Sequence, residues 1–148
     1  MYMCADTNLG GAVNMRSTIM VIVLLFLGSI TAVSGVFRLD SVAGWLQAGA
    51  LPANELDRRY VEHPWLSYLH IVPGMVFFLL APFQFVARIR TRWPGVHRWV
   101  GRVAATAALT AAITSIAAAI VFPAYGNWLS AFSSYVFGTY MTLSLVLA

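Results

Sequence analysis

The sequence predicts an all-α integral membrane protein, and two observations carry that prediction. Of the 148 residues, 60% are hydrophobic and only 9% are charged, and the mean hydropathy is +0.78. A soluble domain usually carries about 25% charged residues, because polar groups must cover its surface. The few charges also cluster, so long stretches carry none. Such a chain is expected to form a multi-span helical bundle whose outer surface faces lipid.

Four apolar stretches are each long enough to cross a bilayer. A hydrocarbon core about 30 Å thick takes roughly 20 helical residues at about 1.5 Å per residue. The predicted transmembrane helices, at least four in number, cover about residues 17–37, 65–87, 103–122 and 130–148. Ahead of them, residues 1–16 are predicted to form a weakly polar N-terminal tail, and residues 17–148 a single transmembrane helical domain.

The two ends of the sequence add further expectations. Small residues follow the first apolar run at Ala32, Ser34 and Gly35, so a cleaved signal peptide is the alternative to a first span. The apolar core of a signal peptide, at about 7–15 residues, is usually shorter than this run. The last run is still apolar at Ala148 and has no flanking charge, so we expect a C-terminus truncated within a span.

The connections between the spans differ in charge. Residues 38–63 have a net charge of −1 and are predicted to form a polar connection, with an interfacial segment at Trp45 and a short helix from Asn54 to Glu62. Residues 88–102 hold five arginines and no acid. Because short arginine-rich loops stay cytoplasmic, this loop and the N-terminus are predicted to lie on the inner side of a bacterial cytoplasmic membrane.

The formal net charge of +4 does not indicate a nucleic-acid partner, because the positive residues lie between apolar spans. The predicted partners are the lipid bilayer and, for residues 88–102, anionic lipid headgroups. Assembly into a homo- or hetero-oligomer stays open. Cys4 is the only cysteine, which excludes an intramolecular disulfide and a thiolate metal site.

The second span collects polar and small residues on one helical face. Steps of one helical period from His70 lie within about 40° of one line, and they reach Gly74, Phe77, Ala81, Gln84 and Arg88. Pro73 would release the carbonyl of Leu69, and Pro82 would loosen the helix near Gln84. Polar side chains and irregular backbone at membrane depth belong against protein or a cavity. We therefore expect this face to point inward.

The third span carries a stripe of small residues on the face of His97. The same steps give Gly101, Ala104, Ala108, Ala111 and Ser115. Small faces mainly let helices approach closely, and a flat cofactor against this stripe is the alternative. A second stripe of Thr106, Thr110 and Thr114 is expected to bond to carbonyls of the preceding turn.

His70 and His97 are the candidate cofactor ligands. They are predicted to lie at opposite ends of the membrane, about 25 Å apart, so they cannot share one metal ion, and no metal site is predicted. Two separate haem sites would each need a partner from another helix. The alternative for His97, which has Arg98 and Arg102 beside it, is contact with lipid headgroups or a helix cap.

One stretch of the sequence, residues 62–103, resembles a family of bacterial predicted membrane proteins, the domain of unknown function 2306. The points of likeness are "HPW" at His63–Trp65, His70 followed by Pro73-Gly74, "PFQF" at Pro82–Phe85 and "HRWVGR" at His97–Arg102. The resemblance implies further spans and a second loop with histidine and arginine, where partners of the two histidines would be expected. It implies no activity, and a likeness to diheme cytochrome b bundles is analogy alone.

Two functions therefore remain open. The favoured one is a non-catalytic component of the membrane, transporter-like, sensor or structural, with a cavity lined by His70 and Gln84. The alternative is a b-type haem electron-transfer protein, with His70 as axial ligand of an outer site and His97 of an inner one. The sequence has no nucleophile–base pair, phosphate-binding loop or paired carboxylates that would indicate a hydrolase or transferase.

Overall fold

The computed structural model describes residues 7–121 and 128–147, and it assigns no strand in these residues. The helices are α1 Thr7–Ala48, α2 Glu55–Glu62, α3 Pro64–Leu80, the 3₁₀ helix η1 Ala81–Phe85, α4 Ala87–Arg92, α5 Pro94–Val121 and α6 Trp128–Val146. The all-α prediction is confirmed.

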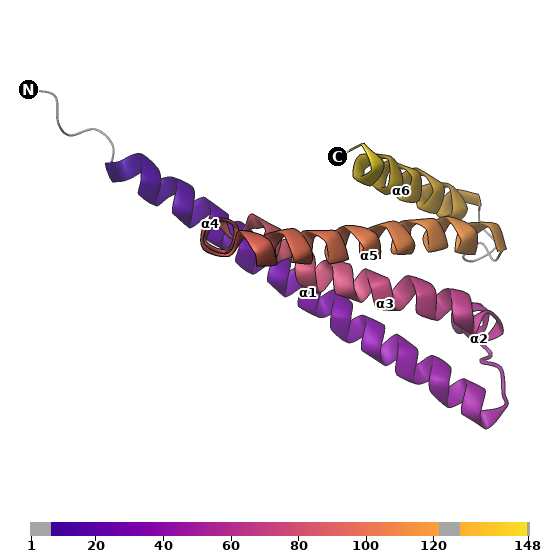
Figure 1. Ribbon diagram of the computed structural model, residues 1–148. Coiled ribbons are helices and arrows are strands. Elements are labelled where there is room, and N and C mark those ends of the chain that lie inside the picture. Colours follow the sequence, from indigo (N-terminus) through magenta and orange to yellow (C-terminus); the bar gives the residue numbers. More distant parts are fainter. Residues whose placement is uncertain (1–6, 122–127, 148) are drawn as a thin grey trace, which may run out of the picture.

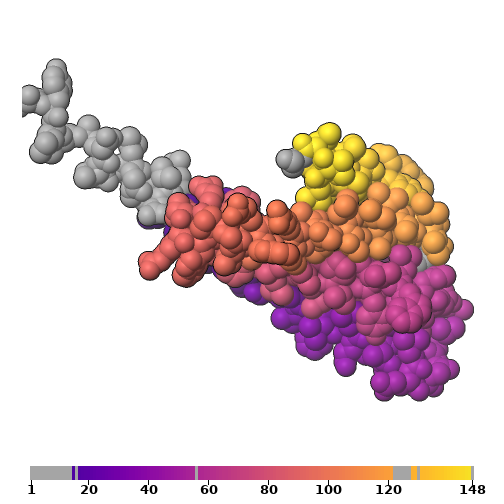
Figure 2. Space-filling model, viewed as in Figure 1, coloured from indigo at the N-terminus to yellow at the C-terminus, as the bar shows by residue number. Residues whose placement is uncertain are grey.

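The long helices lie side by side in chain order (Figure 1). α3 packs between α1 and α5, and α6 packs on α5. In Figure 1, α1, α3 and α5 converge toward α4 and spread apart toward α2. We call these two ends of the bundle the α4 end and the α2 end. Figure 2 shows the side chains of α1, α3 and α5 as adjoining bands, with α6 over α5.

Three helical segments are long and apolar enough to cross a membrane. They are Ser17–Ala48, Pro64–Phe85 and Pro94–Val121. α6, with 19 residues, is not among them. Three of the four predicted spans are therefore matched by candidate membrane helices, and a fourth span stays a prediction.

α1 extends beyond the first predicted span at both ends. It starts at Thr7, within the predicted tail, and runs to Ala48, a length of 42 residues. The helix ends in a Schellman motif, in which Gly49 takes a φ of +62°. The amides of Gly49 and of the next residue donate to the carbonyls of Leu46 and Trp45. Glycine suits this turn because a side chain would be strained at positive φ.

The prediction of a polar connection over residues 38–63 was therefore wrong in its first part, which is helical as far as Ala48. Val42 of this extension and Val61 of α2 are both buried, and the two helices are in contact. Burial against α2 explains why the helix continues past a charged residue. The short helix that was predicted to end at Glu62 is confirmed as α2.

The second span is confirmed with a break near its end. α3 starts at Pro64, where the missing amide proton costs nothing, and contains Pro73. It gives way to η1 at Ala81, and Val86 is then extended. The predicted loosening at Pro82 thus takes the form of a 3₁₀ turn.

The prediction that residues 88–102 form a loop was wrong, because most of them are helical. The helix of the third span also begins earlier than the predicted residue 103. Residues 88–102 include most of α4 and the first turns of α5, which begins at Pro94. Proline at the first position of a helix is favourable, and it sets the start of α5 here. The sequence "PAYGNW" at residues 123–128, which is expected to form a short turn between the third and fourth predicted spans, lies almost wholly outside the described residues.

α5 forms most of the core through its small side chains. The buried residues of this helix are Ala104, Ala107, Ala108, Ala112 and Ala119. The predicted threonine stripe is also confirmed: Thr106, Thr110 and Thr114 each donate to the carbonyl four residues earlier, at 2.9, 2.9 and 2.7 Å. Small residues on one face and self-satisfied hydroxyls let α3 and α6 both pack closely on α5.

Candidate functional site

His70 of α3 is fixed by a hydrogen bond to α5. Its Nδ1 lies 2.9 Å from the backbone carbonyl oxygen of Ala111. A carbonyl only accepts, so Nδ1 carries the proton and donates it, and Nε2 keeps a lone pair. Thr114 Oγ1 lies 3.4 Å from the same Nδ1 and 3.4 Å from the Leu69 carbonyl that Pro73 leaves without its helical donor. The predicted inward face of the second span therefore packs on the predicted small stripe of the third.

A groove of about 520 Å³ lies beside His70, with walls from α1, α3, α5 and α6 and with Tyr60 of α2. The walls are apolar for the most part and include many small residues, such as Gly35, Gly74, Ala108, Ala112 and Gly138. Arg38, Tyr60, His70 and Ser115 contribute polar groups. A size of about 300–1,000 Å³, with apolar walls and few polar groups, is usual for small-molecule sites.

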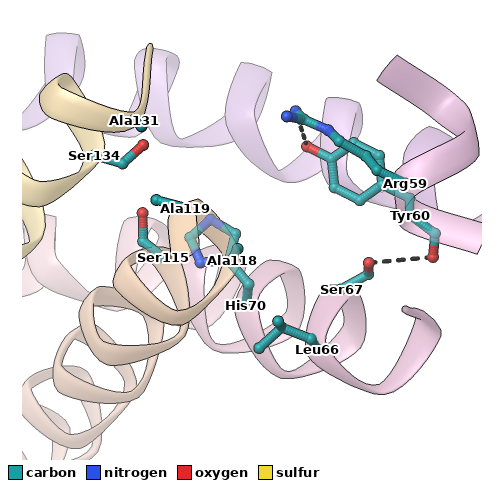
Figure 3. Close-up of a pocket in the computed structure, with 10 residues that line it drawn as sticks. All are labelled: Arg59, Tyr60, Leu66, Ser67, His70, Ser115, Ala118, Ala119, Ala131 and Ser134. Carbon is teal, nitrogen blue, oxygen red and sulfur yellow. Dashed lines mark hydrogen bonds between the residues drawn. The ribbon is translucent and has the colours of Figure 1, made fainter. Parts of the chain in front are cut away.

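A second, smaller cavity of about 130 Å³ lies toward the α2 end, and His70 lines it as well (Figure 3). Its walls are more polar than those of the groove. They include Arg59, Tyr60, Ser67, Ser115 and Ser134. We call these two spaces the groove and the polar cavity. They are neighbours that share His70, Tyr60 and Ser115 in their linings.

α2 positions the charged groups at this end. Asp57 of α2 forms an ion pair with Arg38 of α1. The guanidinium carbons of Arg38 and Arg59 lie 5.0 and 4.9 Å from the centre of the Tyr60 ring. Arg59 also donates from Nη2 to the Tyr60 hydroxyl at 3.3 Å. Ser67 is buried at 3% exposure, and its hydroxyl lies within hydrogen-bond distance of two carbonyls, at 3.0 and 3.2 Å.

Sequence reasoning missed this cluster. Its residues lie in a connection that was treated as polar surface. The available signal was Arg38 at the end of an apolar run, with acidic and basic residues following at Asp57 and Arg59. An arginine at that position needs a counter-charge or an aromatic ring nearby. Which acid and which ring it meets depends on the packing of α2 against α1 and α3.

Gln84 and His97 lie together with Gly101 at the α4 end rather than beside His70. A Cβ on Gly101 would stand 3.0 Å from Gln84 Oε1, so η1 and α5 approach closely here. Gln84 Nε2 and His97 Nδ1 are both buried, and neither has a hydrogen-bond partner among the described residues. The groove lining does not include Gln84. The structure thus brings His70 and Gln84 onto one face of the helix but not into one cavity.

The arginines at the α4 end are exposed. Arg88 lines a hollow of about 270 Å³ between residues 17–22 of α1 and residues 85–88, where η1 ends and α4 begins. Arg102 lies with its guanidinium carbon 5.8 Å from the Trp99 ring. Arg98 is exposed. Within residues 7–121 and 128–147, the two ion pairs, Arg38–Asp57 and Arg58–Glu62, are both at the α2 end.

Searches of curated proteins and of solved structures find no match to this chain. The model of the family described as predicted membrane protein, domain of unknown function 2306, matches residues 67–148. That match covers α5, α6 and nearly all of α3, and it confirms the resemblance seen in the sequence. It covers more than half of the chain, so the protein belongs to this family of predicted membrane proteins.

Proposed function

We propose that this chain is a non-catalytic component of the membrane, transporter-like or sensor-like, which binds an apolar or amphipathic ligand in the groove beside His70. One observation carries the proposal: the hydrogen bond from His70 Nδ1 to the Ala111 carbonyl. It holds the imidazole in one orientation and leaves the Nε2 lone pair for a ligand. In the described part of the chain, no hydrogen bond to Nε2 is found, and the two bonds of the ring are both at Nδ1.

The shape and lining of the groove support this proposal. Its lining is mostly apolar, and its charged group, Arg38, lies with Tyr60 near the α2 end. A ligand with an apolar body and one polar end fits that distribution. Gln84, which the sequence placed on the same face, is not part of this proposed site.

Thiol labelling tests whether water reaches the groove. A Cβ at Gly74 meets nothing within 4 Å, so Gly74→Cys places a thiol at the groove without a clash. Val33 is 54% exposed and does not line the groove, so Val33→Cys is the matched lipid-facing control. Both variants are made with Cys4→Ser and reconstituted in vesicles. A membrane-impermeant thiol reagent is expected to label Gly74→Cys and not Val33→Cys. Equal labelling, or none at Gly74→Cys, contradicts a transporter-like groove.

Haem b is the second candidate ligand, and the hydrogen bond of His70 to Ala111 supports this candidate as well. Metal-bound histidines typically donate their other ring nitrogen to a carbonyl or carboxylate, as His70 does to Ala111. The small residues of the groove would admit a flat macrocycle, and Arg38 would supply positive charge for its carboxylates. The buried, unpartnered Nδ1 of His97 supports a separate inner ligand. Bound haem would supply one-electron transfer.

An absorption spectrum separates the two candidates. The protein is purified from cells supplied with ample haem precursor, and reduced-minus-oxidised spectra are recorded. Haem ligation predicts an α band that His70→Ala abolishes or shifts and that His63→Ala leaves intact. A colourless protein, or a band unaffected by His70→Ala and His97→Ala, excludes these two histidines as axial ligands.

The membrane arrangement is part of the proposal. α6 is the fourth span, the N-terminus is cytoplasmic, and the arginines of residues 88–102 contact anionic headgroups of a bacterial cytoplasmic membrane. The confinement of the ion pairs found in the described residues to the α2 end, with exposed arginines at the α4 end, supports this orientation. A reporter fused after Arg92 should read cytoplasmic. A periplasmic signal from that fusion reverses the orientation.

A further inference from the structure

The polar cavity holds a positive charge that no acid in the described part of the chain neutralises. Arg59 lines it, and neither ion pair in residues 7–121 and 128–147 includes this arginine. A guanidinium has five N–H donors. One donates to the Tyr60 hydroxyl, while Nε is buried with no partner. A half-buried arginine with unused donors is a site for an anion.

The neighbouring arginines show that this state is specific to Arg59. Arg38 is paired with Asp57, and Arg58 is paired with Glu62 at 2.7 Å. Both acids of these pairs belong to α2. The helix therefore provides counter-charges for Arg38 and Arg58, and neither acid pairs with Arg59. The lining of the polar cavity includes no acidic residue among those the structure describes.

His70 gives the cavity an acceptor as well. Its Nδ1 proton is committed to Ala111, so Nε2 can only accept a hydrogen bond while the ring is neutral. Figure 3 shows the His70 ring at one side of the cavity, with Ser115 beside it and Arg59 and Tyr60 across from it. The Ser115 hydroxyl can donate or accept. A complementary ligand thus carries an anionic group for Arg59 and a hydrogen-bond donor for His70.

We propose that the polar cavity binds a small organic anion that carries a hydroxyl or amino group, such as a short hydroxycarboxylate. Arg59 binds the carboxylate, and His70 Nε2 accepts from the hydroxyl. The volume of about 130 Å³ is on the order of four water molecules at about 30 Å³ each, which limits the ligand to a few heavy atoms. This inference goes beyond the proposed function, because Arg59 does not line the groove. His70 Nε2 has one lone pair, so the anion uses it only while no groove ligand does.

Binding is tested with glycolate on the purified full-length protein in detergent, by isothermal titration calorimetry. Acetate lacks the hydroxyl donor, and glycolamide lacks the charge. Acetate is expected to bind about fivefold more weakly than glycolate, because one neutral hydrogen bond is lost. Glycolamide is expected to bind about tenfold more weakly or worse, because the charged contact with Arg59 is lost. Absence of saturable glycolate binding, or equal binding of glycolamide, overturns the proposal.

Two pairs of variants assign the site. Arg59→Gln should weaken glycolate at least tenfold, whereas Arg58→Gln, one residue away and already paired with Glu62, should leave it unchanged. Ala118→Leu fills the polar cavity from α5 and should abolish binding with Arg59 intact. Gly74→Leu fills the groove instead and should leave glycolate binding unchanged. Circular dichroism checks that each variant keeps its helices.

The variants also keep the two proposals apart. If glycolate binds Arg59→Gln or Ala118→Leu as it binds the wild type, the polar cavity is not its site and this inference fails. That result leaves the thiol-labelling test of the groove untouched. Conversely, glycolate binding that Ala118→Leu removes stands even when Gly74→Cys is not labelled.

Discussion

The two ends of the bundle differ in how their charged side chains are partnered. At the α2 end the helices spread apart, and charged side chains from α1 and α2 pair with one another around two cavities. At the α4 end the helices converge on glycines, and the arginines are exposed without acidic partners in the described residues. Among the described residues, each end keeps buried polar atoms without a hydrogen-bond partner: Arg59 Nε at the α2 end, and Gln84 Nε2 and His97 Nδ1 at the α4 end.

The difference shows how helix spacing determines chemistry. Gly28 of α1 lies so close to α3 that an added Cβ would stand 2.5 Å from the Phe78 carbonyl oxygen. This close contact leaves no room for a side chain at position 28, although Phe78 also lines the groove. Toward the α2 end the same helices are held apart, and α2 is in contact with both α1 and α3. The polar cavity lies at the end where α2 contacts both helices, whereas the α4 end has the hollow lined by Arg88.

The largest expected effect is at the close contact. Gly28→Ala puts a methyl group against backbone, which cannot yield as a flexible side chain would, and should cost about 1–3 kcal/mol of the free energy of unfolding. Gly44 lies in the same helix with nothing within 4 Å, so Gly44→Ala should be neutral or stabilise by up to about 1 kcal/mol. Thermal unfolding in detergent measures both. Equal effects would show that the convergence at Gly28 is not tight.

An intermediate effect is expected at the α2 end. The Arg38 and Asp57 side chains are 33% and 35% exposed, and their pair joins two helices. A double-mutant cycle with Arg38→Gln and Asp57→Asn should give a coupling of about 1 kcal/mol. The control cycle on Arg58 and Glu62, which are 53% and 41% exposed within one helix, should give about 0.3–0.5 kcal/mol. A weaker coupling in the first cycle would mean that the ion pair does not hold α2 in place.

The smallest effect is expected at Gln84. Its Nε2 is buried without a partner, so Gln84→Met removes an unsatisfied group while keeping a similar shape. The free energy of unfolding should stay within about 0.5 kcal/mol or rise. A loss of more than about 1 kcal/mol would show that the amide has a bonded partner, and that the two ends are less different than described.

The sequence predicted the elements whose causes are local. The helix start at Pro64, the break at Pro82 and the threonine bonds of α5 each depend on residues within one or two turns. The inward face was predictable as well, because helical periodicity places His70 and Gln84 on one line. The Ala111 carbonyl as the partner of His70 was not, since it depends on how far α5 slides along α3.

The wrong predictions also concern features that depend on contacts between separate helices. The end of α1 was placed too early because charge at Arg38 and Asp40 was taken as the start of a connection, whereas packing against α2 keeps the helix intact to Ala48. The polar cavity was missed for the same reason: Arg59 and His70 are brought together by the return of α2 onto α3. Contacts that join separate helices set these features, and periodicity carries no information about them.

α1 is long enough that a small rotation about its close contact with α3 moves its far end by several ångströms. The segment Ser17–Ala48 has 32 residues, about 48 Å at 1.5 Å per residue, so even a tilt of about 40° cannot fit it within a core about 30 Å thick. Ala48 lies twenty residues beyond the close contact at Gly28, and a rotation of about 5° about that contact moves the far end of a helix about 30 Å away by about 3 Å. At Arg38, ten residues and about 15 Å from the same contact, the rotation moves the helix by about 1.3 Å, so the ion pair with Asp57 is sensitive to the angle between α1 and α3.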